Sequence, residues 1–144
     1  MEKKILIVDD DKSILQIFKN ILETGGYVVD TVETGREAIE KSEAEYYNLA
    51  LLDIKLPDME GTELLTCMHK AIPKMMKIII TGYPSLKNAV DAVNKGADAY
   101  VTKPVKPGNL LKVVDEKLRE QEEAEMLSEK KVAEWIESRI RKLE

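Results

Sequence analysis

The sequence predicts an α/β fold: a doubly wound, five-stranded parallel sheet with helices on both faces. Five short, largely apolar runs, at residues 5–8, 28–31, 49–52, 77–80 and 99–101, alternate with segments of helical periodicity. The runs are almost continuously apolar, which is typical of strands buried on both faces. Strict alternation of strands and helices indicates parallel pairing through right-handed crossovers.

Five helices are expected between and after these strands. The first ends at Gly25-Gly26, because glycine commonly terminates a helix. The second, over residues 35–44, has a weaker pattern. The third closes at Pro73, and the fourth ends before Gly96. Four of these helices have an apolar stripe. The stripes are Ile14, Leu15, Phe18, Ile21 and Leu22 in the first helix; Leu64, Leu65, Met68 and Ile72 in the third; Leu86, Ala89, Val90 and Val93 in the fourth; and Leu110, Leu111, Val114 and Leu118 in the fifth.

Composition limits the classes of protein to consider. The chain has 144 residues, enough for one domain with an appendage, and a net charge of −5 argues against direct nucleic-acid binding. A single cysteine, Cys67, excludes an internal disulfide and suits a reducing cytoplasm. We find neither a signal-peptide pattern nor an apolar run of about 18 residues, so we expect a cytoplasmic protein with no membrane association.

The last part of the chain has a different pattern. We predict a division into a domain at 1–120 and a helical extension at 121–144, because residues 119–131 are highly charged. After them, Ala133, Ile136, Ile140 and Leu143 recur at helical spacing, next to Trp135. This helix could be solvated or pack on the domain, or it could bind a partner or a second copy through residues 132–143. Disorder is a third alternative, and an exposed Trp135 favours an interface.

Polar residues gather where the predicted strands end. In open parallel sheets, ligands bind beyond the carboxyl ends of the strands. The residues found there are Asp9, Asp10 and Asp11 after the first strand, Asp53 after the third, Thr81 and Gly82 after the fourth, and Lys103 and Pro104 after the fifth. Carboxylates, a hydroxyl and an ammonium group are therefore expected to converge at one edge.

This set of groups suits magnesium and a phosphoryl group. Clustered carboxylates without histidine or cysteine favour a hard cation, and Mg²⁺ fits best. A metal ion and Lys103 would balance the adjacent aspartates, whose mutual repulsion is otherwise costly. A hydroxyl at Thr81 and an ammonium at Lys103 suit phosphoryl oxygens. Asp53 could then act as a nucleophile and form an aspartyl phosphate.

Four motifs carry a resemblance to a known family. "LIVDDD", "LLDIKLPDMEG", "TGYP" and "YVTKP" follow one another in this order. With them, about the first 118 residues resemble the receiver domain of two-component response regulators. The resemblance implies a flavodoxin-like sheet of order 2-1-3-4-5. It also implies a phosphorylation-activated signalling switch, rather than an enzyme with a separate substrate, that regulates a partner or an attached output. The phosphoryl donor would be a sensor histidine kinase or a phosphotransfer protein.

The resemblance also implies roles for residues around the phosphorylation site. Asp53 matches the phosphorylated aspartate, and Lys103 matches the family's invariant lysine. The Mg²⁺ ligands would be Asp10, Asp53 and the backbone carbonyl of Lys55, with Asp9 acting through a water molecule. Asp53, Lys103 and Thr81 would be the groups that catalyse the chain's own phosphorylation and dephosphorylation.

Further positions relate to switching and to local structure. Thr81 matches the switch hydroxyl and Tyr100 the switch aromatic, which would turn inward when Thr81 moves to the phosphoryl group. The family implies a cis peptide before Pro104. Gly82 should leave the phosphoryl pocket open, and Asp11 is expected to cap the helix that follows it.

Two positions that vary in the family suggest a slow loss of the phosphoryl group. Lys55 lies two residues after the phosphorylation site, and Tyr83 lies two residues after Thr81. A long cation and a bulky aromatic group could both hinder the attacking water. We therefore expect slow self-dephosphorylation.

Two other functions share parts of this pattern. Phosphatases of the haloacid-dehalogenase type also use a magnesium-bound aspartyl nucleophile, and Asp9 is followed by Asp11 at their spacing. However, Lys12 and Ser13 stand where a "DGT"-type continuation is expected, and "LLDIKLPDMEG" favours the receiver. A phosphorylation-independent interaction domain is disfavoured because the complete phosphorylation set is present. No output domain is recognisable in the sequence, although some segments resemble receivers attached to transcriptional activators.

Overall fold

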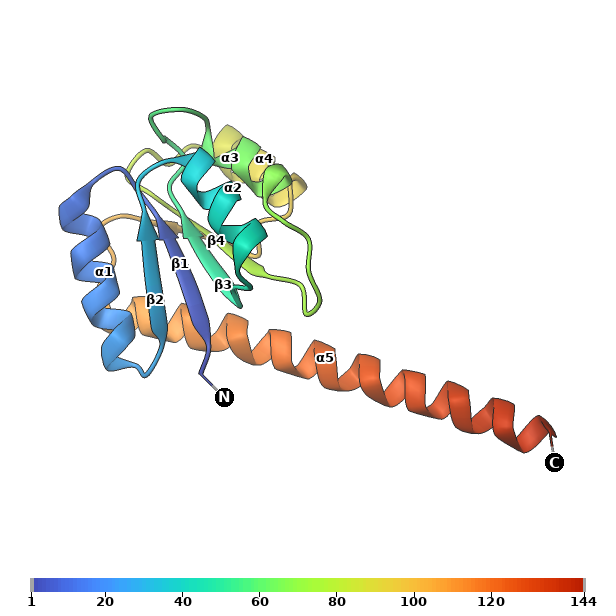
Figure 1. Cartoon of the computed structure of the whole chain (residues 1–144). Helices are drawn as coiled ribbons and strands as arrows, with labels where there is room; N and C mark the ends of the chain where they lie inside the picture. The colour runs from blue at the N-terminus through green and yellow to red at the C-terminus, as the bar shows by residue number, and fades with distance from the viewer. Residues whose placement is uncertain (1, 144) are drawn as a thin grey trace.

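A computed structural model of the chain describes residues 2–143 and shows strands and helices in strict alternation (Figure 1). In chain order the elements are β1 (Lys4–Val8), α1 (Lys12–Thr24), β2 (Val28–Val32), α2 (Gly35–Ala44), β3 (Leu49–Leu52), α3 (Gly61–Cys67), β4 (Met76–Thr81), α4 (Leu86–Asn94), β5 (Ala99–Thr102) and α5 (Pro107–Leu143). Within these residues, no helix combines the length and the apolar character that crossing a membrane requires.

The five strands form one parallel sheet in the order β2-β1-β3-β4-β5, which confirms the predicted fold class and strand order. The order reverses at β1, which lies between β2 and β3. In this class of sheet, the reversal creates a crevice at the carboxyl ends of the strands. The residues that follow β1 and β3 therefore lie at the position where a ligand is expected.

The sheet separates two apolar cores because successive strand residues point to opposite faces. On one face, Leu6 and Val8 pack with buried side chains of α2, α3 and α4. On the other face, Ile5 and Ile7 pack with buried side chains of α1 and α5. Both faces of the central strands are thus dry, which explains their almost continuously apolar sequences.

The predicted third helix was too long. α3 ends at Cys67, and its C-cap is Met68. Ile72, which continues the apolar periodicity, lies in the loop before β4 with 96% of its surface exposed. The fourth helix has the predicted position, but Leu86 and Val90 of its stripe are exposed and its buried residue is Ala92.

α5 is one uninterrupted helix, rather than a domain helix followed by a separate short one. Its first part packs on the sheet through Leu110, Val114 and Leu118, and its second part projects away from the body (Figure 1). Gln121 is the last buried residue of the described helix. Its side-chain amide nitrogen donates to the backbone carbonyl oxygens of Asn48 (2.8 Å) and Lys74 (2.7 Å), so the helix is anchored where it leaves the body.

Candidate functional site

Strand pairing places the predicted site residues next to one another. Val8 pairs with Leu52, so Asp9 and Asp53 leave the sheet side by side, and the amide of Asp53 donates to the carbonyl of Val8 at 3.1 Å. Thr81 ends β4, and the amide of Lys103 donates to its carbonyl oxygen at 2.8 Å. Residues 9, 53, 81 and 103, far apart in sequence, therefore share one edge of the sheet.

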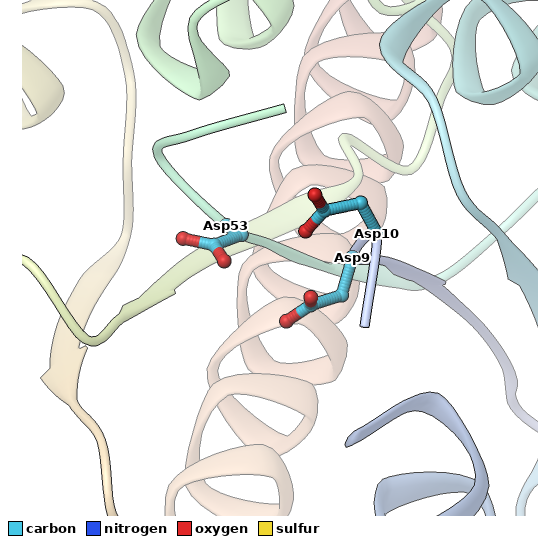
Figure 2. A group of neighbouring side chains, drawn as sticks. All are labelled: Asp9, Asp10 and Asp53. Carbon is cyan, nitrogen blue, oxygen red and sulfur yellow. The ribbon is translucent and has the colours of Figure 1, made fainter. Parts of the chain in front are cut away.

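Three carboxylates meet at this edge, as Figure 2 shows. Asp9, Asp10 and Asp53 each offer an oxygen atom, and these atoms all lie within 4.8 Å of one another. Asp9 and Asp53 are buried, whereas Asp10 is exposed. The cluster is therefore open to solvent on the side of Asp10.

Lys103 bridges the two buried carboxylates. Its Nζ lies 2.6 Å from Asp9 Oδ2 and 3.1 Å from Asp53 Oδ2. Burial alone would lower the pKa of Lys103, but the hydrogen bonds to Asp9 and Asp53 and the charges of these carboxylates together outweigh it and raise that pKa above its ordinary value. Burial raises the pKa of Asp9, an effect that Lys103 partly offsets. One cation thus faces three carboxylates, and the centre keeps an excess of negative charge.

The donor set of the site fits Mg²⁺. It consists of carboxylate oxygens, and the part of the chain that the structure describes brings neither histidine nor cysteine into the cluster. A hard divalent cation prefers such oxygen ligands and retains water in its remaining positions. Asp10, exposed beside the buried pair, leaves room for that water.

The loop after β3 folds back tightly on Asp53. The amide of Gly61 donates to the carbonyl of Ile54 at 2.5 Å, and a Cβ at position 61 would lie 2.0 Å from the carbonyl oxygen of Asp53. Only glycine permits this approach, so Gly61 shapes the loop. In the same loop, Lys55 donates its amide to Asp53 Oδ1 at 3.4 Å and pairs with Glu60 in an isolated bridge.

Thr81 and Tyr100 lie on adjacent strands beside the site. Thr81 is fully buried, and its hydroxyl oxygen accepts the amide of Tyr83 at 3.0 Å. Tyr100 packs against the core that faces α2, α3 and α4. Its hydroxyl is buried and has no hydrogen-bond partner within residues 2–143. Because such an unpaired group is costly, Tyr100 holds a position that a small rearrangement could relieve.

Two expectations about local structure are confirmed. The side chain of Asp11 accepts hydrogen bonds from the amides of Ser13 (2.9 Å) and Ile14 (3.2 Å) and so caps α1. The peptide bond between Lys103 and Pro104 is cis.

Sequence reasoning missed two contacts made by the loop that follows β3. The ammonium of Lys55 lies over the ring of Tyr83, and the carboxylate of Asp58 accepts the amides of Gly35 and Arg36 at 2.9 Å each, at the start of α2. The only sequence signal for the second contact is an acidic residue in a loop, since carboxylates are favoured at helix N-termini.

Fold and site together define a doubly wound α/β domain with an acidic centre and a bridging lysine at the carboxyl edge of its sheet. Residues 5–115 match the family described as "Response regulator receiver domain". The chain belongs to this family, and the resemblance inferred from its motifs is confirmed.

Relatives of known sequence and structure agree. The chain is 36% identical to the phosphoglycerate transport system transcriptional regulatory protein PgtA of Salmonella typhimurium over 83% of this chain and 29% of that protein. It is 36% identical to the alkaline phosphatase synthesis transcriptional regulatory protein PhoP of Bacillus subtilis over 91% of this chain and 55% of that protein. The chain therefore spans only part of the length of these relatives.

A solved structure gives the same result. It is a CheY-like response regulator receiver domain protein from Methanospirillum hungatei JF-1. It is 56% identical and superposes with a TM-score of 0.83 over 86% of this chain and 99% of that one. A receiver domain is a signalling switch activated by phosphorylation, and that is the class of function this chain has.

Proposed function

We propose that Asp53 accepts a phosphoryl group, in a Mg²⁺-dependent reaction, from a sensor histidine kinase or a phosphotransfer protein. The observation that carries this proposal is the position of Lys103, whose Nζ bridges Asp9 and Asp53 at 2.6 and 3.1 Å. A lysine held against this carboxylate at the edge of the sheet can neutralise phosphoryl oxygens as they approach.

The transfer replaces a phosphorus–nitrogen bond with a phosphorus–oxygen bond. A carboxylate oxygen of Asp53 attacks the phosphorus of a phosphohistidine, the phosphorus–nitrogen bond breaks, and the imidazole leaves with that electron pair. Bound Mg²⁺ supplies charge neutralisation for the phosphoryl oxygens. Asp10, Asp53 and the backbone carbonyl of Lys55 would hold the ion directly, and Asp9 would hold it through water. In self-dephosphorylation, water attacks the phosphorus, the bond between the phosphorus and the Asp53 oxygen breaks, and inorganic phosphate leaves the regenerated carboxylate.

The switch would use Thr81 and Tyr100. The Thr81 hydroxyl would exchange its bond from the amide of Tyr83 for one to a phosphoryl oxygen, and Tyr100 would repack beside it. The hydroxyl of Tyr100, buried and without a partner among residues 2–143, supports two alternative packings of this region. The signal would then pass to a partner or to an attached output.

The remaining assignments also belong to this proposal. We assign the signalling domain to residues 1–120 and the extension to residues 121–144. Of these ranges, residues 1 and 144 lie outside the described part. We expect a cytoplasmic protein without direct nucleic-acid binding, in keeping with its net charge of −5. The PgtA and PhoP relatives are transcriptional regulators, so output through an attached or separate regulator is the corresponding expectation.

Intact-mass spectrometry after incubation with acetyl phosphate and Mg²⁺ tests the proposal. We expect a mass increase of one phosphoryl group that disappears with EDTA and in Asp53→Asn. Asp91→Asn is the matched control, because Asp91 lies on α4 and pairs there with Lys95. This variant should label as the wild type does.

The alternatives predict other results. A folded protein that gains no phosphoryl group from acetyl phosphate or from a histidine kinase would support a phosphorylation-independent interaction domain. Sustained turnover of a phosphomonoester that survives in Asp53→Asn would support the haloacid-dehalogenase-type phosphatase, which the family assignment disfavours.

A further inference from the structure

The distal part of α5 is an amphipathic helix with nothing packed on it. Every residue from 126 to 143 is exposed, including Trp135 (60%), Ile140 (54%) and Leu143 (87%). Val132, Ile136, Ile140 and Leu143 follow at spacings of four, four and three, and so share one face. Helices gain most of their stability by packing such a face, so this one calls for a partner.

A groove lies at the other end of the same extension. It encloses about 630 Å³ between α5 and the loop that precedes β4. Its loop side includes Ile72 and Pro73, and its helix side includes Ala124, Glu125 and Glu129. Ile72 stands 96% exposed at this groove, so the body of the protein also presents an uncovered apolar side chain beside the helix.

The extension is divided by charge. Residues 120–129 contain five glutamates and neither lysine nor arginine. Residues 130–142 contain five basic residues and two glutamates, a net charge of +3 (5 − 2). Two parallel extensions would place acidic against acidic and basic against basic. Two antiparallel extensions would place each acidic half against a basic half, so charge favours the antiparallel arrangement.

We propose that two copies of this chain associate through antiparallel packing of their α5 extensions, with the end of each helix at the groove beside the partner's Ile72. The inference does not depend on the phosphorylation chemistry. The apolar residues follow a heptad pattern, with Ala133 and Ile140 at a positions and Ile136 and Leu143 at d positions. Met126 occupies the a position one heptad before Ala133. Antiparallel pairing of a with d sets Ala133 against the partner's Ile136, and Met126 against the partner's Leu143.

The same register accounts for two further features. It brings Ile140 and Leu143 to the level of the partner's residues 126–129, at the outer end of the groove. It also brings Lys130 near the partner's Glu137, twice by symmetry. Within residues 2–143 of one chain, neither Lys130 nor Glu137 takes part in an ion pair.

Disulfide trapping in the full chain distinguishes the arrangements. Cys67 is exposed, so Cys67→Ser provides a background for Met126→Cys and Leu143→Cys made separately. In the antiparallel dimer, position 126 of one chain lies about 25 Å along the axis from position 126 of the other, at 1.5 Å per residue, and the same holds for the two positions 143. Position 126 of each chain instead faces position 143 of the other. We expect a disulfide only when the two variants are mixed. Disulfides within each variant alone, or no disulfide from a folded mixture, would overturn the proposal.

Charge variants test the register, and surface variants test the groove. Lys130→Glu and Glu137→Lys should each raise the dissociation constant of the dimer several-fold, as measured by sedimentation, and the double variant should restore it. Ile72→Glu should raise the dissociation constant at least tenfold, while Leu86→Glu, on an exposed position of α4, should leave it unchanged. A monomer at all concentrations, a double variant weaker than either single one, or equal effects at positions 72 and 86 would refute the antiparallel dimer.

Discussion

The ammonium of Lys55 lies over the ring of Tyr83, with 4.5 Å between Nζ and the ring centroid. Lys55 comes from the loop that follows Asp53, and Tyr83 from the loop that follows Thr81. The two side chains therefore join loops that flank the proposed phosphorylation site. A cation held over an aromatic face is attracted by about 0.5–1 kcal/mol at exposed sites, so the contact orders both loops.

The pair should slow the loss of a phosphoryl group from Asp53. We expect Lys55→Ala and Tyr83→Ala each to shorten the phosphoryl lifetime by up to about tenfold, because either change removes cover from the path of the attacking water. The decay of labelled protein after removal of the donor measures this lifetime. Lys87→Ala, a change on the exposed surface of α4, should leave it unaltered. Unchanged lifetimes in both site variants would contradict the expectation.

Magnesium should stabilise the folded chain without any phosphoryl donor. Three carboxylates face one ammonium at the site, so a bound cation relieves repulsion. At about ten times its dissociation constant, the ion should add about 1.4 kcal/mol to the free energy of unfolding and raise Tm by about 4 °C. Calorimetry with and without Mg²⁺ at constant ionic strength measures the shift. It should vanish in Asp10→Asn and persist in Asp91→Asn, and the reverse pattern would disprove the assigned ligand.

Asp58 should make stability depend on acid pH. Hydrogen bonds from the amides of Arg36 and Gly35 hold the pKa of Asp58 below its ordinary value. A carboxyl group whose pKa is lower in the folded state stabilises the fold above its unfolded pKa of about 3.9, and this contribution fades as pH falls through the folded value. Denaturant titrations should show wild type more stable than Asp58→Asn at pH 7, with the difference shrinking below about pH 4. A difference independent of pH would contradict this account.

Gln121 should anchor the extension. Its side chain donates to two backbone carbonyls and also accepts a hydrogen bond from the side-chain amide of Asn48 at 3.3 Å. Gln121→Leu removes these three hydrogen bonds, and although the backbone carbonyl of Asn48 keeps the amide of Met76 at 3.0 Å, the change should cost about 2 kcal/mol in urea denaturation. Gln16→Leu, at an exposed site on α1 with one side-chain hydrogen bond to Asn20, should cost little. Hydrogen exchange should also quicken in residues 117–125 of Gln121→Leu, and unaltered exchange would argue against an anchor.

The sheet and the centre of the site could be predicted because both depend on strand ends. Once strands are assigned, parallel pairing forces Asp9 and Asp53 together, and the fifth strand brings Lys103 to the same edge. The burial of Asp9 and the exposure of Asp10 were not predictable in this way. They depend on how far each side chain lies beyond the sheet.

Element boundaries and contacts between loops were harder to predict. Ile72 continues the spacing of α3 by coincidence, because periodicity cannot register that the chain has already turned at Met68. The continuity of α5 did have a signal, since neither glycine nor proline occurs after Gly108, but the run of charges obscured it. The contact of Lys55 with Tyr83 joins two loops whose paths no local pattern specifies.

The uninterrupted course of α5 makes the extension a lever arm whose fulcrum is Gln121. From there to residue 143 the helix is about 33 Å long. A tilt of about 5° at the body would therefore carry the far end through about 3 Å, more than half of one helical turn. A change too small to disturb either core could in this way become a displacement large enough to shift how two extensions meet.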